Sequence, residues 1–314
     1  MNKKLVMASL LTLGITGIQT GHAEDKTSRG FYLGVFGGGG TSDNDHISQS
    51  GEAFKRTGGL QGGYRDSRED FNLLVNVDGK SQSHATSIGG LHLGYEFPEL
   101  PIGNNLSDWG VRPAVELEGY YLGSSMSGTL TNRNPETFDG LAGGLVSLNG
   151  TTQLDPGQHK FVDTFSQDMG VLLTNAVFSF KTPASKHILP YLGGGIGAAI
   201  NSLSGSNSAQ VASGSPYAGN EVGLNHFNSN STASSSAFAA QFKAGVRAEL
   251  FDRLSVFVEY RYLHVTDSNY TFGSTEYPAV GSSYPGGHAQ TTAWNVGLGA
   301  MNYHTGIFGL QYAY

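Results

Sequence analysis

The sequence predicts an all-β protein, a transmembrane antiparallel up-and-down β-barrel of eight strands. Three observations predict it: apolar and polar residues alternate, long and short connections alternate, and the N-terminus looks like an export signal. Only 14% of the 314 residues are charged, against 38% hydrophobic, which is unlike the surface of a soluble enzyme. The net charge of −7 offers no basic stripe, so we expect no nucleic-acid partner.

The N-terminal segment has the three parts of a secretory signal. Lys3 and Lys4 precede an apolar run from Leu5 to Ile18, which is short for a spanning helix, and Gly21-His22-Ala23 is a plausible cleavage site. We expect residues 1–23 to be a signal peptide cleaved near Ala23, and residues 24–314 to form the barrel. The chain has no cysteine, so the exported domain cannot depend on disulfides.

Eight segments show the period-2 alternation of strands. In chain order they are residues 30–38, 86–97, 109–122, 167–180, 188–200, 238–250, 254–263 and 291–314.

The first three segments each carry one apolar face, and so do 167–180, 238–250 and 254–263, whereas 188–200 is rich in glycine. The first three faces hold Phe31, Leu33, Val35, then Leu91, Leu93, Tyr95, Phe97, then Val111, Val115, Leu117 and Tyr121. In 167–180 the face ends with Ala176, Phe178 and Phe180. The two segments 238–250 and 254–263 are the most regular, with Phe242, Ala244, Val246, Ala248, Leu250, Val256, Val258, Tyr260 and Tyr262.

The last segment shares one parity throughout, because Trp294, Val296 and Leu298 are even-numbered like Phe308 and Leu310. This favours one long strand, and two strands joined by a turn near residues 301–304 are the alternative. Ten strands are possible if this segment or residues 71–77 add strands to the barrel.

Connections between the segments alternate in length. The long ones span about 39–85, 123–166, 201–236 and 265–290, and the short ones 98–108, 181–187 and 251–253. Short periplasmic turns and long extracellular loops are typical of outer-membrane barrels. Such loops also carry function in many proteins.

A soluble β-sandwich would show the same alternation, with its apolar face buried. The aromatic residues favour the membrane, because they lie at strand ends beside short turns or the C-terminus, where an interfacial girdle belongs. They are Tyr95, Phe97, Phe178, Phe180, Tyr312 and Tyr314.

The opposite face would point into the barrel and carries a balanced set of charges. We predict a lumen charge network of Glu96, Arg112, Glu116, Glu118, Lys243, Arg247, Glu249, Glu259 and Arg261, with His92 on the same face. Buried charges need partners, and an eight-stranded barrel is just wide enough for its own side chains. We therefore expect a plugged interior, with pairings that the sequence leaves open.

Several stretches resemble the small Gram-negative outer-membrane β-barrel superfamily, which includes the transmembrane domain of outer membrane protein A and the opacity-type porin-family surface proteins. They are residues 30–34 (GFYLG), 93–97 (LGYEF), 190–197 (PYLGGGIG), 258–262 (VEYRY) and 308–314 (FGLQYAY). The resemblance implies an outer-membrane location and a C-terminal signal, Tyr312 and Tyr314, read by the outer-membrane assembly machinery. The family usually ends in Phe, and this chain ends in Tyr314.

We expect a structural surface protein whose loops mediate adhesion or host interaction. A narrow ion-conducting channel is the alternative, and a lipid A-modifying enzyme is less favoured. We expect no catalytic, cofactor or metal site, because the glycine run 193–198 lies inside a strand and His226 lacks the spacing of a barrel deacylase. Expected partners are outer-membrane lipid, lipopolysaccharide, the assembly machinery and host surface molecules.

Overall fold

The structure of the chain is a computed structural model. It describes residues 30–44, 46–56, 71–102, 109–132, 136–140, 144–145, 153–154, 160–183, 187–212, 224–275 and 288–314. The predicted signal peptide lies outside these ranges. No helix in the described ranges is long and apolar enough to cross a membrane.

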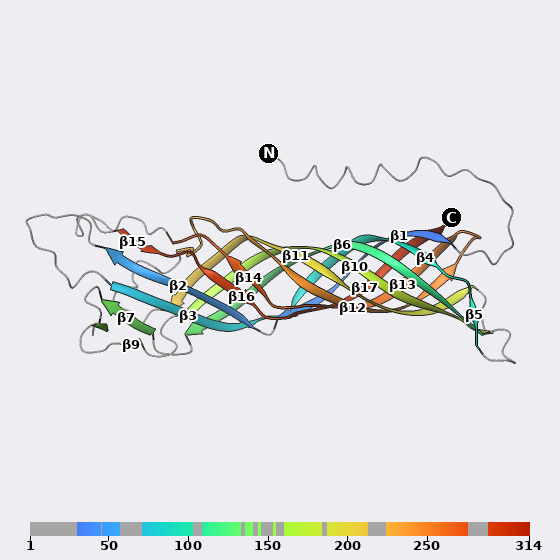
Figure 1. Cartoon of the computed structure of the whole chain (residues 1–314). Helices are drawn as coiled ribbons and strands as arrows, with labels where there is room; N and C mark the ends of the chain where they lie inside the picture. Colours follow the sequence, from blue (N-terminus) through green and yellow to red (C-terminus); the bar gives the residue numbers. More distant parts are fainter. Residues whose placement is uncertain are drawn as a thin grey trace, which may run out of the picture.

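Eight antiparallel strands form a closed ring (Figure 1), which confirms the predicted fold class. They are β1 (Phe31–Asn44), β4 (His84–Glu96), β6 (Gly110–Asn132), β10 (Lys160–Lys181), β11 (Ile188–Ala212), β12 (Ala233–Glu249), β13 (Leu254–Val265) and β17 (Met301–Ala313). Each pairs with the next, and β1 closes the ring by pairing with β17 over its whole length. Closure leaves no strand edge unpaired, which is what a sheet in lipid requires.

The outer surface of the ring carries a belt of apolar side chains. Val246 and Tyr260 on the outside are 45% and 47% exposed, whereas Lys243 and Arg247 on the inside are 1% and 7% exposed. A soluble sandwich would show the reverse, so this alternative is excluded. On β10 the belt covers residues 170–180, and four of the five outward positions above it are polar, Val162 being the exception. Residues 160–169 of β10 therefore lie beyond the bilayer.

Strands continue beyond the belt and form a second level, which we name the extracellular tier because the sequence predicts that these connections are extracellular. It combines the upper parts of β6, β10 and β11 with β2 (Ile47–Arg56), β3 (Phe71–Ser81), β14 (Ser268–Thr271), β15 (His288–Thr291) and β16 (Asn295–Leu298). Short pieces β7 (Glu136–Gly140), β8 (Gly144–Leu145) and β9 (Gln153–Leu154) also belong to this part of the sheet. Figure 1 shows the tier at the end opposite β5 (Leu100–Pro101) and the C-terminus. Segments predicted as loops are thus partly strands.

Four neighbouring strands are interrupted where the tier begins. The breaks follow Asn44, Ser81, Val265 and Leu298, between β1 and β2, β3 and β4, β13 and β14, and β16 and β17. At each break the buried side chains change between odd and even numbers, as one extra residue in a strand requires. Asn44 fixes one break, because its Nδ2 donates to Gly299 O (3.1 Å) and its Oδ1 accepts from His46 N (2.8 Å).

The prediction of one strand with one parity over 291–314 is therefore wrong. Val296 and Leu298 point inward, whereas Phe308 and Leu310 point to lipid. The alternative of two strands joined by a turn near residues 301–304 is wrong too. Strand β16 pairs with β2 and strand β17 pairs with β1, so β17 continues in the direction of β16. Strand β3 and strand β16 lie in the tier and add nothing to the ring, which keeps eight strands.

Candidate functional site

The interior of the molecule has two chemically different parts. Inside the belt it is filled by the predicted charges, which we name the lumen network, and inside the tier it is filled by aromatic rings. A neutral polar layer separates them, in which Tyr303 Oη donates to Gln167 Oε1 (3.2 Å) and Asn201 Nδ2 donates to Tyr270 Oη (2.6 Å).

Lys243 is the centre of the lumen network. Its ammonium group lies between two carboxylates of β6, bonding Glu116 Oε2 and, at 3.0 Å, Glu118 Oε2. Strand alternation explains the pair, because residues two apart on β6 point to the same side. Both carboxylates and Lys243 are almost completely buried. Loss of Lys243 would leave two buried anions close together.

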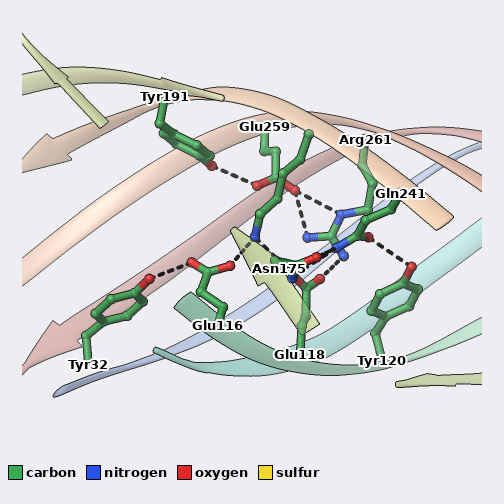
Figure 2. A network of polar contacts seen from close by, with 10 residues as sticks. Tyr32, Glu116, Glu118, Tyr120, Asn175, Tyr191, Gln241, Glu259 and Arg261 are labelled. Atoms are coloured by element: carbon green, nitrogen blue, oxygen red, sulfur yellow. Dashed lines mark hydrogen bonds and ion pairs between the residues drawn. The ribbon is translucent and has the colours of Figure 1, made fainter. Parts of the chain in front are cut away.

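Arg261 forms the second cationic centre (Figure 2). Its guanidinium contacts Glu118 Oε1 through Nη1 and donates to Glu259 Oε1 from Nε (2.9 Å) and Nη2 (2.7 Å). The same group lies over the rings of Phe36 and Tyr120, at 4.6 and 4.9 Å from their centroids, which adds cation–π attraction. Arg261 is 1% exposed, so these contacts replace its entire hydration.

Neutral side chains complete the coordination of the carboxylates. Tyr32 Oη donates to Glu116 (2.8 Å), Tyr191 Oη donates to Glu259 (2.9 Å), and Asn175 Nδ2 donates to Glu118 (2.8 Å) (Figure 2). Gln241 Nε2 donates to Asn175 Oδ1 (2.7 Å) and its Oε1 accepts from Tyr120 Oη (3.1 Å). Such saturation is what makes buried ions tolerable.

The remaining predicted charges lie nearer the periplasmic mouth. Arg247 Nη2 donates to Glu96 Oε2 (2.7 Å), and Arg112 Nη1 donates to Glu249 Oε1 (3.0 Å). The structure thus places all nine predicted side chains on the inner face, in ion pairs. Two members were missed, because they lie in segments assigned to turns: Glu99 accepts from Arg112 Nε (3.2 Å) and from Lys181 Nζ (3.1 Å).

His92 is buried beside the lumen network and packs among aromatic rings, including Phe257 at 5.6 Å between centroids. Room for its ring comes from Gly34, because a Cβ there would collide with it. One ligand atom each of His92, Glu116 and Glu118 lie within 4.8 Å of one another, close enough for a metal ion. Lys243 already bonds both carboxylates, so a metal would have to displace it.

Six side chains, which we name the aromatic seal, fill the tier: Phe161, Phe165, His226, Phe227, Phe272 and Trp294. Phe227 and Phe272 stack with centroids 4.4 Å apart, and the rings of Phe161 and His226 meet edge to face at 5.1 Å. All six are buried, with Phe227 at 0% exposure. None was singled out as interior from the sequence.

A hydrogen-bonded chain holds the seal in place. Trp294 Nε1 donates to Thr275 Oγ1 (2.9 Å), and that hydroxyl donates to His226 O (2.8 Å). Gly51 leaves room for the indole, since a Cβ there would lie 2.5 Å from it. His226, which the sequence presents as a loop histidine near serines, is thus a packing residue with Nδ1 2.9 Å from Ser208 O.

Two voids lie along the lumen. A void of about 200 Å³ opens at the periplasmic mouth, where Arg112, Arg247 and Arg253 line it. Behind Arg247 a second void of about 10 Å³ borders His92 and Lys243, enough for about one water molecule.

The predicted assembly signal lies on the outer face at the periplasmic edge of the belt. Tyr312 and Tyr314 are 42% and 66% exposed, and their rings meet edge to face with centroids 5.5 Å apart. Their position is that of an interfacial aromatic girdle.

Comparison with known proteins finds likeness only among solved structures. No protein-family model and no curated protein matches the chain. Similar solved structures include the outer membrane protein OprG from Pseudomonas aeruginosa (14% identity, 92% of this chain and 99% of that chain, TM-score 0.34). Others are the outer membrane protease OmpT from Escherichia coli (8%, 92% and 100%, 0.28) and Ail, the attachment invasion locus protein of Yersinia pestis (14%, 83% and 98%, 0.19). At these TM-scores the likenesses carry no information on activity or ligand. The fold is shown by the structure itself: the chain is a closed eight-stranded antiparallel β-barrel with an apolar belt, a charged lumen and a tier of strands above the belt.

Proposed function

We propose that the protein is a closed outer-membrane anchor that presents its extracellular tier for contact with molecules outside the cell, as in adhesion or host interaction. The observation that carries this proposal is the double filling of the interior. The lumen network occupies the belt and the aromatic seal occupies the tier. A protein built for passage would leave both of these levels open, whereas a scaffold for display gains rigidity from both.

The pairing of charges supports a lumen that stays closed. Lys243 and Arg261 together contact three carboxylates, and each carboxylate also accepts from a neutral donor. Separating such a buried pair costs about 3–5 kcal/mol, since it leaves an uncompensated charge. Thermal fluctuation alone would open such a lumen only rarely.

Planar-bilayer recording tests the closed state. We expect no stable conductance from the unaltered protein, from Lys243→Ala, or from the pair Phe227→Ala with Phe272→Ala, because each leaves one level filled. Combining all three substitutions is expected to produce conductance. A stable conductance of the unaltered protein that is abolished by Arg112→Ala or Glu116→Gln would overturn the proposal in favour of the channel.

Cell binding tests the display role. Cells that express the protein are expected to bind host cells or extracellular matrix better than cells with an empty vector. Replacing residues 57–70 or 276–287 by a short Gly-Ser linker is expected to reduce this binding while the heat-modifiable gel band of the folded barrel remains. Unchanged binding would contradict the role of these segments, and altered lipid A in the same cells would favour an enzyme.

A further inference from the structure

Asp163 differs from every carboxylate of the lumen network. It lies on β10 inside the tier, seven residues before Gly170, where the belt begins, and it is 0% exposed. Among the described residues no cation forms an ion pair with it. Its polar neighbours are two neutral side chains, Gln49 of β2 and Ser208 of β11.

Gln49 connects opposite walls of the tier. Strand β2 and strand β11 are not neighbours in the sheet, since β3, β6 and β10 lie between them. One end of the Gln49 amide nevertheless lies 2.8 Å from Asp163 Oδ2 and 3.1 Å from Ser208 Oγ. The three side chains therefore form a bridge across the interior, and Asp163 is its middle member.

The proton state of Asp163 decides how this bridge is made. If the amide NH₂ faces Asp163, it donates to a charged carboxylate. If the amide oxygen faces it, two oxygens lie 2.8 Å apart, and the contact is favourable only when the carboxyl group carries a proton and donates it. A neutral carboxyl group also avoids the cost of a charge that no cation compensates.

The surroundings favour the neutral form. The other described titratable side chains that point into the tier are His226, whose Nδ1 lies 2.9 Å from Ser208 O, and Tyr270, whose Oη accepts from Asn201 Nδ2; Asp78, Lys80 and Lys160 are on the outward face of their strands. Burial raises the pKa of Asp163 to about 7 from an ordinary 3.8, although the hydroxyl of Ser208 lowers it in part.

We propose that Asp163, Gln49 and Ser208 form a proton-dependent latch that holds β2 against the β10–β11 wall in acid and loosens as the pH rises to neutrality. The sign follows from linkage. The closed tier holds a proton that an open, hydrated carboxyl group releases, so the stabilisation is complete below about pH 3.8 and is lost as the pH rises through 7. Above about pH 7 the loss of stabilisation no longer changes with pH.

Hydrogen exchange measures the latch directly. The opening equilibrium of residues 47–56, corrected for intrinsic exchange rates, is expected to be on the order of tenfold to a hundredfold larger at pH 8 than at pH 5. Residues 239–248 of β12, inside the belt, serve as the internal reference and are expected to show no such change.

Asp163→Asn is the matched variant, because the amide has the same shape and cannot ionise. Its tier is expected to be equally protected at both pH values. Asp43→Asn, an exposed residue of β1, is expected to keep the pH dependence of the unaltered protein. Equal protection of the unaltered tier at pH 5 and pH 8, or a pH difference that survives in Asp163→Asn, would overturn the latch.

A second measurement needs no change at the latch. Trp109→Phe leaves Trp294, in the aromatic seal, as the one tryptophan. Its fluorescence is expected to titrate with a midpoint near 7. Because the imidazole of His226 packs on Trp294, the same scan is repeated with His226→Gln. A midpoint that disappears with His226→Gln would assign the titration to the histidine and contradict the proposal.

Discussion

The lower and upper halves of β10 show opposite arrangements of the same strand. In the belt, Leu172 and Phe178 face outward and Asn175 faces inward; in the tier, Ser166 faces outward and Phe165 faces inward. Odd-numbered residues point inward throughout. The reversal therefore reflects a change of solvent: lipid outside the belt selects apolar outward side chains, and water outside the tier selects polar ones.

The two halves also gain stability differently. The tier buries aromatic surface as a soluble protein does, which is favourable for each side chain added. The lumen network buries charges, whose mutual attraction mainly compensates their desolvation, so it contributes little until one partner is removed. Each of the following predictions tests one side of this contrast.

The largest effect is expected in the lumen network. Lys243→Ala leaves Glu116 and Glu118 buried without their shared cation and is expected to lower the free energy of unfolding by about 3–5 kcal/mol. Urea unfolding of the protein in lipid vesicles measures the loss. Lys80→Ala, an exposed lysine of the tier, is the control and should change little. A loss below 1 kcal/mol would show that the network hydrates freely.

Next comes the aromatic seal. Phe227→Ala removes a fully buried ring and is expected to cost about 3 kcal/mol, the lower end for such a change because water can enter the tier. The loss should appear as faster hydrogen exchange of tier strands, while the belt strands remain protected. Equal loss of protection in both halves would contradict their independence.

The outer surface provides a third test. Phe242→Arg places a charge in the belt and is expected to cost about 2 kcal/mol, whereas Ser236→Arg, on the same face of β12 but above the belt, should cost almost nothing. Unfolding in vesicles compares the pair. Equal costs would mean that the lipid boundary does not lie between them.

The smallest effect is expected at the periplasmic mouth. Glu249→Gln breaks the pair with Arg112, but Glu249 is 32% exposed and Arg112 keeps Glu99, so the expected loss is below about 1 kcal/mol. The same urea titration measures it. A loss as large as that of Lys243→Ala would mean that the network extends to the mouth as one unit.

The belt could be predicted from the sequence and the tier could not. Alternation locates ring segments such as 238–250 because lipid demands an unbroken apolar face. In the tier, small polar residues such as Ser125 and Ser166 occupy the outward positions, and they resemble a loop until neighbouring strands pair with them. At residues 299–300 the inward-facing side chains change from even to odd numbers. One extra residue is enough for this change, and a single residue does not alter the composition of the segment.

The unbroken course of β10 has a consequence for what can reach this protein. Ten residues above the belt correspond to about 30 Å of strand, which at a strand tilt of about 35–45° reaches roughly 25 Å above the belt. The tip of the molecule is therefore raised well clear of the lipid head groups. Antibodies, phages or neighbouring cells with surface polysaccharides would contact the protein at that height. A polysaccharide coat of similar thickness would cover the tip and prevent this contact.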